Sequence, residues 1–201
     1  MIIDDITQAI GDTPLVKITH LDNISNSHIY AKAEYLNPAG SIKDRVALNM
    51  IESALARGDI APGDTLIEST SGNTGIGLAM VCVLKGLHLI LTMPDSMSIE
   101  RRKLLTHLGA RIVLTPSSQG INGSIERAAK LHQQIANSYL VRQFTNPDNP
   151  NTHYHTTAQE ILDDTDRQID VLVAAIGTGG TIMGIACRLR EEIPDIRIVG
   201  V

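Results

Sequence analysis

The chain has 201 residues, enough for one large domain or two small ones around a packed core. Hydrophobic residues make up 43% of it and charged residues 19%, a balance typical of a folded globular protein and not of a disordered one. Its formal net charge is −5, and its aromatic residues are Phe144 and four tyrosines. An acidic, aromatic-poor chain is poorly suited to bind a phosphate backbone or to stack on bases, so we expect no nucleic-acid partner.

The sequence also argues against a membrane or secreted location. The longest apolar run, from Ile76 to Leu84, is far shorter than the roughly 18–20 residues of a membrane span. The N-terminus carries two acids and no basic region, unlike a secretory signal. Cys82 and Cys187 lie in apolar stretches, which favours two buried thiols over a disulfide or a metal pair. We therefore predict a cytoplasmic protein.

Short β-branched runs alternate with helical patterns along the chain. Strands are expected at 15–18, 29–34, 65–67, 88–92, 110–114, 139–141, 171–176 and 196–201, and helices at 43–57, 72–85, 98–108, 123–137, 155–163 and 180–192. Gly86 and Gly109 stand where C-terminal stop signals of two of these helices should lie. An Asn- and Pro-rich stretch at 146–151 is the expected loop at a domain boundary.

The order of these elements predicts an α/β fold. The strands from residue 65 onward are continuous apolar runs without alternation, as expected where both faces of a sheet are covered. Strand and helix alternate there, which favours a doubly wound, mostly parallel sheet. A strand at 196–201 would need sheet neighbours and a covering connection. We therefore expect the chain to be a fragment or a truncated relative of a longer protein.

Four polar or glycine-rich segments follow predicted strands. They are 37–44, 69–75, the residue Gln143, and 177–181. Ligands of open α/β sheets collect at the carboxyl ends of strands, so their shared position suggests one pocket with several walls.

The segment Gly-Thr-Gly-Gly-Thr at 177–181 opens a predicted helix. Glycines there let backbone N–H groups approach an anion, and the helix N-terminus adds partial positive charge. The segment is not a P-loop, because no Gly-Lys-Ser/Thr follows, and Ile182 stands where a dinucleotide fingerprint has its third glycine. A phosphate cup and a tight strand-to-helix turn both remain open.

Lys43 falls in the first turn of the predicted helix at 43–57, with Ser41 and Asp44 in the spacing of a capping box. The helix dipole is unfavourable for a cation at that place. A lysine with a lowered pKa is a good amine nucleophile and proton carrier. The alternative is a solvated surface lysine, which is the commoner case.

The segment Ser-Thr-Ser-Gly-Asn-Thr-Gly at 69–75 offers hydroxyls and one carboxamide, and it is followed by Gly77. Each glycine costs a helix interior up to about 1 kcal/mol. Either a flat or anionic ligand approaches the backbone here, or the glycines allow close helix packing. The basic run Arg101, Arg102 and Lys103 is interpreted as the solvated face of the helix at 98–108.

In these segments the sequence resembles the cysteine synthase (O-acetylserine sulfhydrylase) family of fold-type II pyridoxal-phosphate enzymes. The matching stretches are 11–16 (GDTPLV), 37–45 (NPAGSIKDR), 68–77 (ESTSGNTGIG), 93–98 (MPDSMS) with 100–102 (ERR), 143–147 (QFTNP) and 177–181 (GTGGT). They span the whole chain in family order. The resemblance is therefore more specific than any single glycine motif.

The resemblance implies a role for each motif. Lys43 matches the catalytic lysine that forms the Schiff base with pyridoxal 5′-phosphate and moves the substrate α-proton, and Asn73 matches the asparagine on the cofactor's ring hydroxyl. The residues implied to hold the substrate carboxylate are Thr70, Ser71, Gly72, Thr74 and Gln143. Those implied to hold the cofactor phosphate are Gly177, Thr178, Gly179, Gly180 and Thr181. No metal is expected.

The implied chemistry is β-replacement, in which L-cysteine forms from O-acetylserine and sulfide, or a related sulfur donor, through an aminoacrylate. The cofactor acts as the electron sink while the protein orients the substrate and excludes water. Cystathionine synthase, serine or threonine dehydratase, and a truncated, non-catalytic partner-binding member remain as alternatives. The resemblance also implies a homodimer, and it offers the tail of serine acetyltransferase as a candidate partner.

By the same resemblance, residues 1–36 are crossover strands of the larger domain, 37–146 form the smaller mobile domain, and 147–201 begin the larger, truncated one. The family's Thr-Gly-Pro-Glu is replaced here by Thr157-Ala-Gln-Glu160, so the helix start there is expected to differ. The family's serine at the pyridine nitrogen lies beyond the end of this sequence. Without that part, one face of the cofactor pocket is expected to be absent, so activity is expected of the intact protein rather than of these 201 residues alone.

Overall fold

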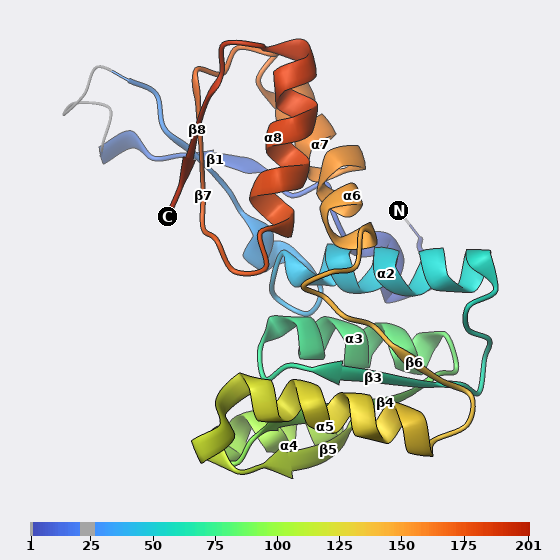
Figure 1. Ribbon diagram of the computed structural model, residues 1–201. Coiled ribbons are helices and arrows are strands. Elements are labelled where there is room, and N and C mark those ends of the chain that lie inside the picture. The colour runs from blue at the N-terminus through green and yellow to red at the C-terminus, as the bar shows by residue number, and fades with distance from the viewer. Residues whose placement is uncertain (1, 21–26) are drawn as a thin grey trace. The chain divides into compact units, whose positions relative to one another are not determined.

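The computed structural model describes residues 2–20 and 27–201 (Figure 1). The chain divides into two compact units, one made of Met1–Ile42 with Pro150–Val201 and the other of Lys43–Asn149.

The unit Lys43–Asn149 is built around a parallel sheet of β3 (Thr65–Ser69), β4 (His88–Pro94), β5 (Arg111–Thr115) and β6 (Ser138–Leu140), in the order β5-β4-β3-β6. Its helices are α2 (Lys43–Arg57), α3 (Asn73–Leu84), α4 (Ile99–His107) and α5 (Gly120–Gln134), with a 3-10 turn at Ser117–Gln119. All three strand pairs are parallel. The predicted doubly wound α/β arrangement is confirmed.

Both faces of this sheet are covered, which explains the unbroken apolar character of its strands. Leu66, Leu91 and Val141 face a buried cluster with residues of α2, α3 and α4. Ile67, next to Leu66 on β3, and Ile90, next to Leu91 on β4, point to the opposite face and pack in a second buried cluster with α5. Figure 1 shows α2 and α3 on one side of β3 and α5 on the other.

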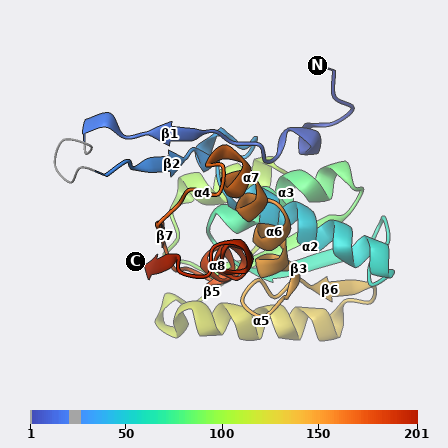
Figure 2. The same ribbon diagram turned by 90° about the horizontal axis from the view of Figure 1, so that it is seen from above.

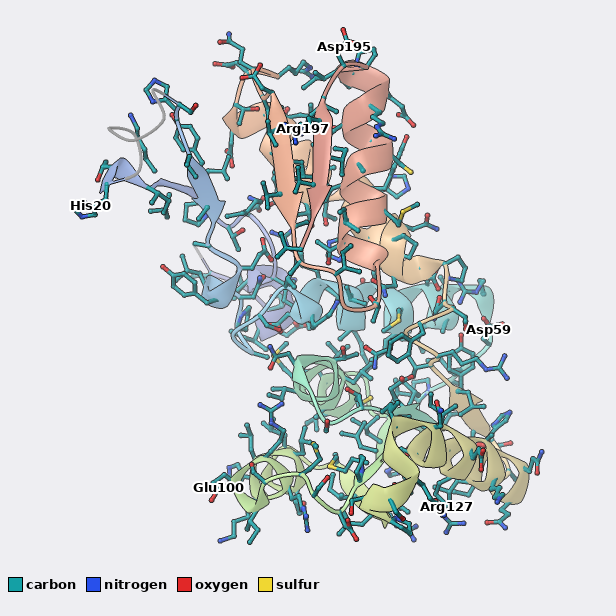
Figure 3. The ribbon with its side chains drawn as sticks, turned by 60° about the vertical axis from the view of Figure 1, so that its left-hand side comes forward. His20, Asp59, Glu100, Arg127, Asp195 and Arg197 are labelled. Atoms are coloured by element: carbon teal, nitrogen blue, oxygen red, sulfur yellow. The ribbon has the colours of Figure 1, made fainter. Side chains whose placement is uncertain are left out.

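The other unit contains two small sheets. Strands β1 (Leu15–Lys17) and β2 (Tyr30–Lys32) pair antiparallel and lie side by side in Figure 2. Strands β7 (Val171–Ala174) and β8 (Arg197–Gly200) pair in parallel. The helices are α6 (Asp148–His155), which begins at the unit boundary, α7 (Thr157–Asp164) and α8 (Gly180–Glu192), with 3-10 turns at Ile6–Ala9 and Glu34–Leu36. Asp195 lies in the short connection from α8 to β8 (Figure 3).

The N-terminal segment is tied to α7 within its unit. Lys32 Nζ lies 2.7 Å from a Glu160 carboxylate oxygen, and both side chains are largely buried. The other Glu160 oxygen accepts a hydrogen bond from the Asp12 backbone N–H at 3.1 Å. Two segments far apart in sequence are thereby joined by a partly buried charge pair.

Several sequence predictions are wrong in detail. The stretch 146–151 is a loop only up to Pro147, because Asp148 begins helix α6. The Asn146 side chain accepts a hydrogen bond from the Asp148 N–H at 2.9 Å, and Pro150 falls in the first turn, where a helix needs no N–H donor. Helix α5 begins at Gly120, three residues earlier than the expected start at 123. Gly86 and Gly109, in contrast, have positive φ after α3 and α4, as helix stops should.

The two cysteines differ from one another. Cys82 on α3 is buried, as expected, but Cys187 on α8 is exposed. The face of α8 that meets the core of its unit carries Gly184, Ile185 and Leu189, and Cys187 lies off that face. The apolar composition of the helix did not reveal which side Cys187 occupies.

Candidate functional site

Lys43 is the first residue of α2, as the sequence predicted. Burial lowers the pKa of its amine below the usual value for lysine. The start of α2 packs closely on α3, because a Cβ added at Gly77 would lie 3.1 Å from the Lys43 carbonyl oxygen. Lys43 is therefore a partly buried amine whose backbone is held against the second turn of α3, and not a freely solvated surface lysine.

The loop after β3 and Gln143, three residues after the end of β6, meet at one edge of the sheet. The Thr74 hydroxyl donates to the Gln143 side-chain oxygen at 2.7 Å, and both residues are buried. The Gln143 side-chain nitrogen lies 3.4 Å from the Ser69 carbonyl oxygen. The Asn149 side chain donates to the Gln143 carbonyl oxygen at 2.8 Å, which fixes the backbone there. The structure thus brings two of the four predicted segments together.

The remaining residues of this loop differ in exposure. Thr70 is buried, and its hydroxyl accepts a hydrogen bond from the Gly72 N–H at 3.2 Å. Asn73 opens α3 and is exposed. Ser71 is half-buried, and its carbonyl oxygen accepts a hydrogen bond from the Arg101 guanidinium at 2.8 Å. An exposed carboxamide beside hydroxyls and backbone N–H groups is suited to bind polar groups of a small ligand.

Arg101 and Lys103 are exposed, as expected for a solvated face, whereas Arg102 is half-buried. Both arginines also bind loop carbonyls, because Arg101 donates to the Ser71 carbonyl oxygen and Arg102 Nε donates to the Met97 carbonyl oxygen at 2.9 Å. Glu100, on the same helix α4, points away from the sheet (Figure 3). The signal that was missed is that an arginine next to a helix start can bond carbonyl groups of neighbouring loops.

The glycines of α3 serve packing. A Cβ at Gly75 would lie 3.1 Å from Leu91 Cδ1 and 3.2 Å from Thr70 Cγ2. One at Gly77 would lie 3.0 Å from the Ala47 Cβ. Close helix packing, the alternative left open by the sequence, therefore explains these two glycines. Of Gly72, Gly75 and Gly77, Gly72 alone leaves room for a ligand, because the nearest atom to a Cβ added there is 3.9 Å away.

Glu68 was not singled out as a site residue by sequence reasoning, although an acid inside the apolar run 65–69 is a signal in itself. It is 3% exposed. Burial raises the pKa of its carboxyl to about 7, while hydrogen bonds from the backbone N–H groups of Gln143 and Arg142 and from the Gln143 side chain lower that pKa. A buried carboxyl group therefore lies next to the Thr74–Gln143 pair.

In the other unit, the predicted anion cradle opens α8. Gly179 is the N-cap of α8 and has a φ of +83°, a conformation that favours glycine. A Cβ added at Gly177 or Gly179 would meet nothing within 4 Å, so both glycines border open space. The Gly180 N–H donates to the Thr178 hydroxyl at 3.3 Å. The first-turn N–H groups of a 13-residue helix and its dipole suit this place to an anion.

Thr181 is fixed from α6. His153 is fully buried, and its Nε2 lies 3.2 Å from the Thr181 hydroxyl oxygen. Its Nδ1 lies 3.0 Å from the Thr157 hydroxyl oxygen. His153 is not among the site residues that the sequence predicted. The link to Thr181 depends on tertiary packing and had no signal in the sequence.

These residues fit pyridoxal phosphate in kind. An amine with a lowered pKa is suited to condense with an aldehyde, and a glycine-lined helix N-terminus is suited to hold a phosphate. Lys43, Asn73, the loop 69–74 and Gln143 belong to one unit, and 177–181 to the other. Within 2–20 and 27–201, no group of three or more His, Cys, Asp or Glu side chains is placed to hold a metal ion. Nor is any helix of this part long and apolar enough to cross a membrane.

Comparison with known proteins identifies the class to which this arrangement belongs. Residues 6–201 match the family described as pyridoxal-phosphate dependent enzyme. This match covers nearly the whole sequence, in agreement with the resemblance of its motifs. The chain belongs to the family of pyridoxal-phosphate-dependent enzymes.

Individual relatives carry more specific names than the family. The chain is 52% identical over 194 residues to a cysteine synthase of Flavobacterium sp., covering 96% of this chain and 63% of the relative. It is 48% identical over 200 residues to a cysteine synthase of Staphylococcus aureus, covering 99% of this chain and 64% of the relative. A crystal structure of an O-acetylserine-dependent cystathionine β-synthase from Helicobacter pylori is similar with a TM-score of 0.94 and 44% identity, over 100% of this chain and 66% of that one. The chain thus spans less than two thirds of the length of these relatives, and its fold is that of the fold-type II enzymes.

Proposed function

We propose that the protein is a cysteine synthase, a transferase that replaces the acetate of O-acetylserine with sulfide to give L-cysteine. The observation that carries this proposal is the partly buried amine of Lys43, with its lowered pKa, in a chain about 50% identical to two cysteine synthases. When bound, pyridoxal phosphate would supply the electron sink for removal of the substrate α-proton and loss of acetate.

The residues of this chain have separate tasks in the proposal. Lys43 holds the cofactor and carries the α-proton, for which a lowered pKa is suitable. Asn73 binds the cofactor ring hydroxyl. The cofactor phosphate binds at Gly177, Thr178, Gly179, Gly180 and Thr181. The substrate carboxylate binds at Thr70, Ser71, Gly72, Thr74 and Gln143.

Borohydride reduction of the full-length protein with pyridoxal phosphate, followed by peptide mapping, tests the role of Lys43. We expect the reduced label on Lys43 and no cofactor absorbance in Lys43→Ala. Lys130→Ala, an exposed lysine on α5, is the matched control and should behave as the wild type. A label on another lysine, or none at all, would refute the assignment.

A cystathionine synthase is the second candidate, because the Helicobacter pylori relative bears that name. Steady-state rates with sulfide, thiosulfate and homocysteine as acceptors of the three-carbon unit separate the two activities. A cysteine synthase should have its highest kcat/KM with sulfide, and a cystathionine synthase with homocysteine.

We propose in addition a homodimer in the cytoplasm. Free Cys82 and Cys187 support a reducing compartment.

The family resemblance also supports a domain organisation in which 37–146 is a mobile domain, 1–36 crosses over, and 147–201 belongs to the larger domain. Sedimentation of the full-length protein tests the dimer, and titration with the C-terminal peptide of serine acetyltransferase tests that partner.

A further inference from the structure

A buried histidine lies behind the anion cradle at the start of α8. The His153 ring on α6 is fully buried, with its Nε2 3.2 Å from the Thr181 hydroxyl oxygen and its Nδ1 3.0 Å from the Thr157 hydroxyl oxygen. Thr157 begins α7, and Thr181 lies in the first turn of α8. Figure 1 shows α6 and α7 beside α8, and all three side chains belong to the unit that contains Pro150–Val201. They form a chain of hydrogen bonds that ends at the cradle.

Packing and hydrogen bonding fix the His153 ring from two helices. A Cβ added at Gly184 would lie 2.8 Å from the His153 Cβ, so α8 touches the base of this side chain. Thr157 is 1% exposed, so its hydroxyl is closed off from solvent. Thr156 and Thr165 give their hydroxyl protons to the carbonyl oxygens four residues earlier, at 2.8 and 2.7 Å. The Thr157 hydroxyl faces the His153 ring instead, so its proton is available to Nδ1.

The direction of these hydrogen bonds decides what Thr181 can offer a ligand. A neutral imidazole has one N–H donor and one bare nitrogen that accepts, so it satisfies two hydroxyl partners in either of two tautomers. With the proton on Nε2, the ring donates to the Thr181 oxygen and leaves the Thr181 proton for a ligand. With the proton on Nδ1, the bare Nε2 takes the Thr181 proton, and the hydroxyl turns only lone pairs outward. Phosphate oxygens accept hydrogen bonds, so the first tautomer suits an anion in the cradle and the second does not.

We propose that His153 and Thr157 are positioning residues for the phosphate site, holding the Nε2–H tautomer so that the Thr181 hydroxyl donates to the bound phosphate. The donors then run in one direction, from the Thr157 hydroxyl to Nδ1, from Nε2–H to the Thr181 oxygen, and from the Thr181 hydroxyl to the anion. Hydrogen bonds in such a chain polarise one another, which strengthens the last one. The inference rests on the proposed function, because it takes the anion at 177–181 to be the phosphate of pyridoxal phosphate.

Three substitutions separate donation to Thr181 from the filling of space. His153→Phe keeps an aromatic ring without a donor, whereas His153→Gln keeps an N–H donor on a flexible side chain. Thr157→Val removes the hydroxyl and keeps a branched side chain. Thr165→Val is the matched control, because Thr165 follows α7 directly and its hydroxyl bonds the Ile161 carbonyl oxygen.

The first measurement is the tautomer of His153, by nitrogen-15 nuclear magnetic resonance (NMR) on the full-length holoenzyme. The chemical shifts of the two ring nitrogens show which of them carries the proton, and the His153 signals are identified by their loss in His153→Gln. We expect the proton on Nε2 and a bare Nδ1. Thr157→Val should move the Nδ1 signal, and Thr165→Val should leave it in place. This NMR readout does not require turnover.

The second measurement is the dissociation constant of inorganic phosphate, by calorimetry on the cofactor-free full-length protein. Inorganic phosphate reports on the cradle without the bond to Lys43. His153→Phe should bind it about tenfold more weakly, as expected for loss of one hydrogen bond to a charged group, and His153→Gln should stay within about threefold of the wild type. Thr157→Val should bind about threefold more weakly, because the ring keeps its donor but loses the bond that polarises it. Thr165→Val should bind as the wild type does.

A double-mutant cycle distinguishes action through Thr181 from support of the fold. Thr181→Val removes the hydroxyl that the ring is proposed to orient. His153→Phe should weaken phosphate binding about tenfold in the wild type but less than about twofold in the Thr181→Val background. If His153→Phe does not fold, the tautomer and the phosphate affinity of Thr157→Val decide the inference.

A His153 ring protonated on Nδ1, or on both nitrogens, in the holoenzyme would overturn the inference. An equal loss of phosphate affinity from His153→Phe in both backgrounds would do the same. If the full-length protein makes no cysteine while the tautomer and the phosphate affinities are as expected, the proposed function fails and the roles of His153 and Thr157 stand. If it makes cysteine and the variants bind phosphate as the wild type does, the inference fails and the proposed function stands.

Discussion

Gly184 on α8 is a glycine that the structure leaves no room to replace. A Cβ added there would overlap the Pro150 carbonyl oxygen and lie 2.8 Å from the His153 Cβ, both on α6. Carbon atoms in contact normally sit about 3.5–4.0 Å apart, so α8 would have to move away from α6 by about 1 Å. Overpacking of this kind costs up to about 3 kcal/mol, and the better helix propensity of alanine returns about 1 kcal/mol.

Gly184→Ala should therefore destabilise the protein by about 2 kcal/mol and lower its Tm by about 4–8 °C. Gly177→Ala is the control, because a Cβ at Gly177 meets nothing within 4 Å. Its Tm should stay within about 2 °C of the wild type. Its affinity for pyridoxal phosphate should fall nonetheless, since the new methyl group enters the open space of the cradle. Thermal unfolding of the full-length protein measures the first effect, and cofactor titration the second. A Gly184→Ala protein as stable as the wild type would refute the assigned helix contact.

Three further outcomes follow from charge and burial. The pKa of Glu68 is about 7 in the folded protein and 4.5 as its ordinary value, so the folded state binds more protons between those pH values. Stability should fall by about 3 kcal/mol as pH rises across that window, and urea midpoints of Glu68→Gln should lack this fall. Burial raises the pKa of Cys82 to about 12, whereas Cys187 is exposed. Iodoacetamide at pH 8 should therefore label Cys187 first, which peptide mass mapping would show. Equal labelling of the two cysteines would count against the burial of Cys82. Lys32→Ala should cost about 3 kcal/mol, because it removes the ammonium group that offsets the charge of the largely buried Glu160 carboxylate. Lys32→Ala with Glu160→Gln should recover part of this loss in a denaturant titration, and a Lys32→Ala protein as stable as the wild type would contradict the pair.

Much of the sheet-containing unit was predictable because its signals are local. Apolar runs gave the four parallel strands, and Gly86 and Gly109 marked helix ends that the positive φ values confirm. The stretch 146–151 misled because its prolines and asparagines favour loops. Asn146 and Pro150 there serve the start of a helix, which also uses such residues.

The site was predictable only as far as residue type and position decide it. Lys43 could be placed at a helix start from spacing alone. Its burial, and therefore its lowered pKa, depends on residues distant in the sequence that pack around it. The links from Arg101 to Ser71 and from His153 to Thr181 join elements 30 and 28 residues apart. No local pattern encodes such contacts.

Glycines show most clearly why the sequence alone left two interpretations open. Gly75 and Gly177 both stand near a helix start in a polar loop, so their sequence surroundings are alike. An added Cβ at Gly75 would press on Leu91 at 3.1 Å, whereas one at Gly177 would meet open space. A glycine needed for packing and a glycine needed for ligand approach look the same in the sequence. Both are glycines because a Cβ at that position would collide, in one case with protein atoms and in the other with the ligand. What differs is whether the excluded volume already holds protein atoms, and only tertiary structure carries that information.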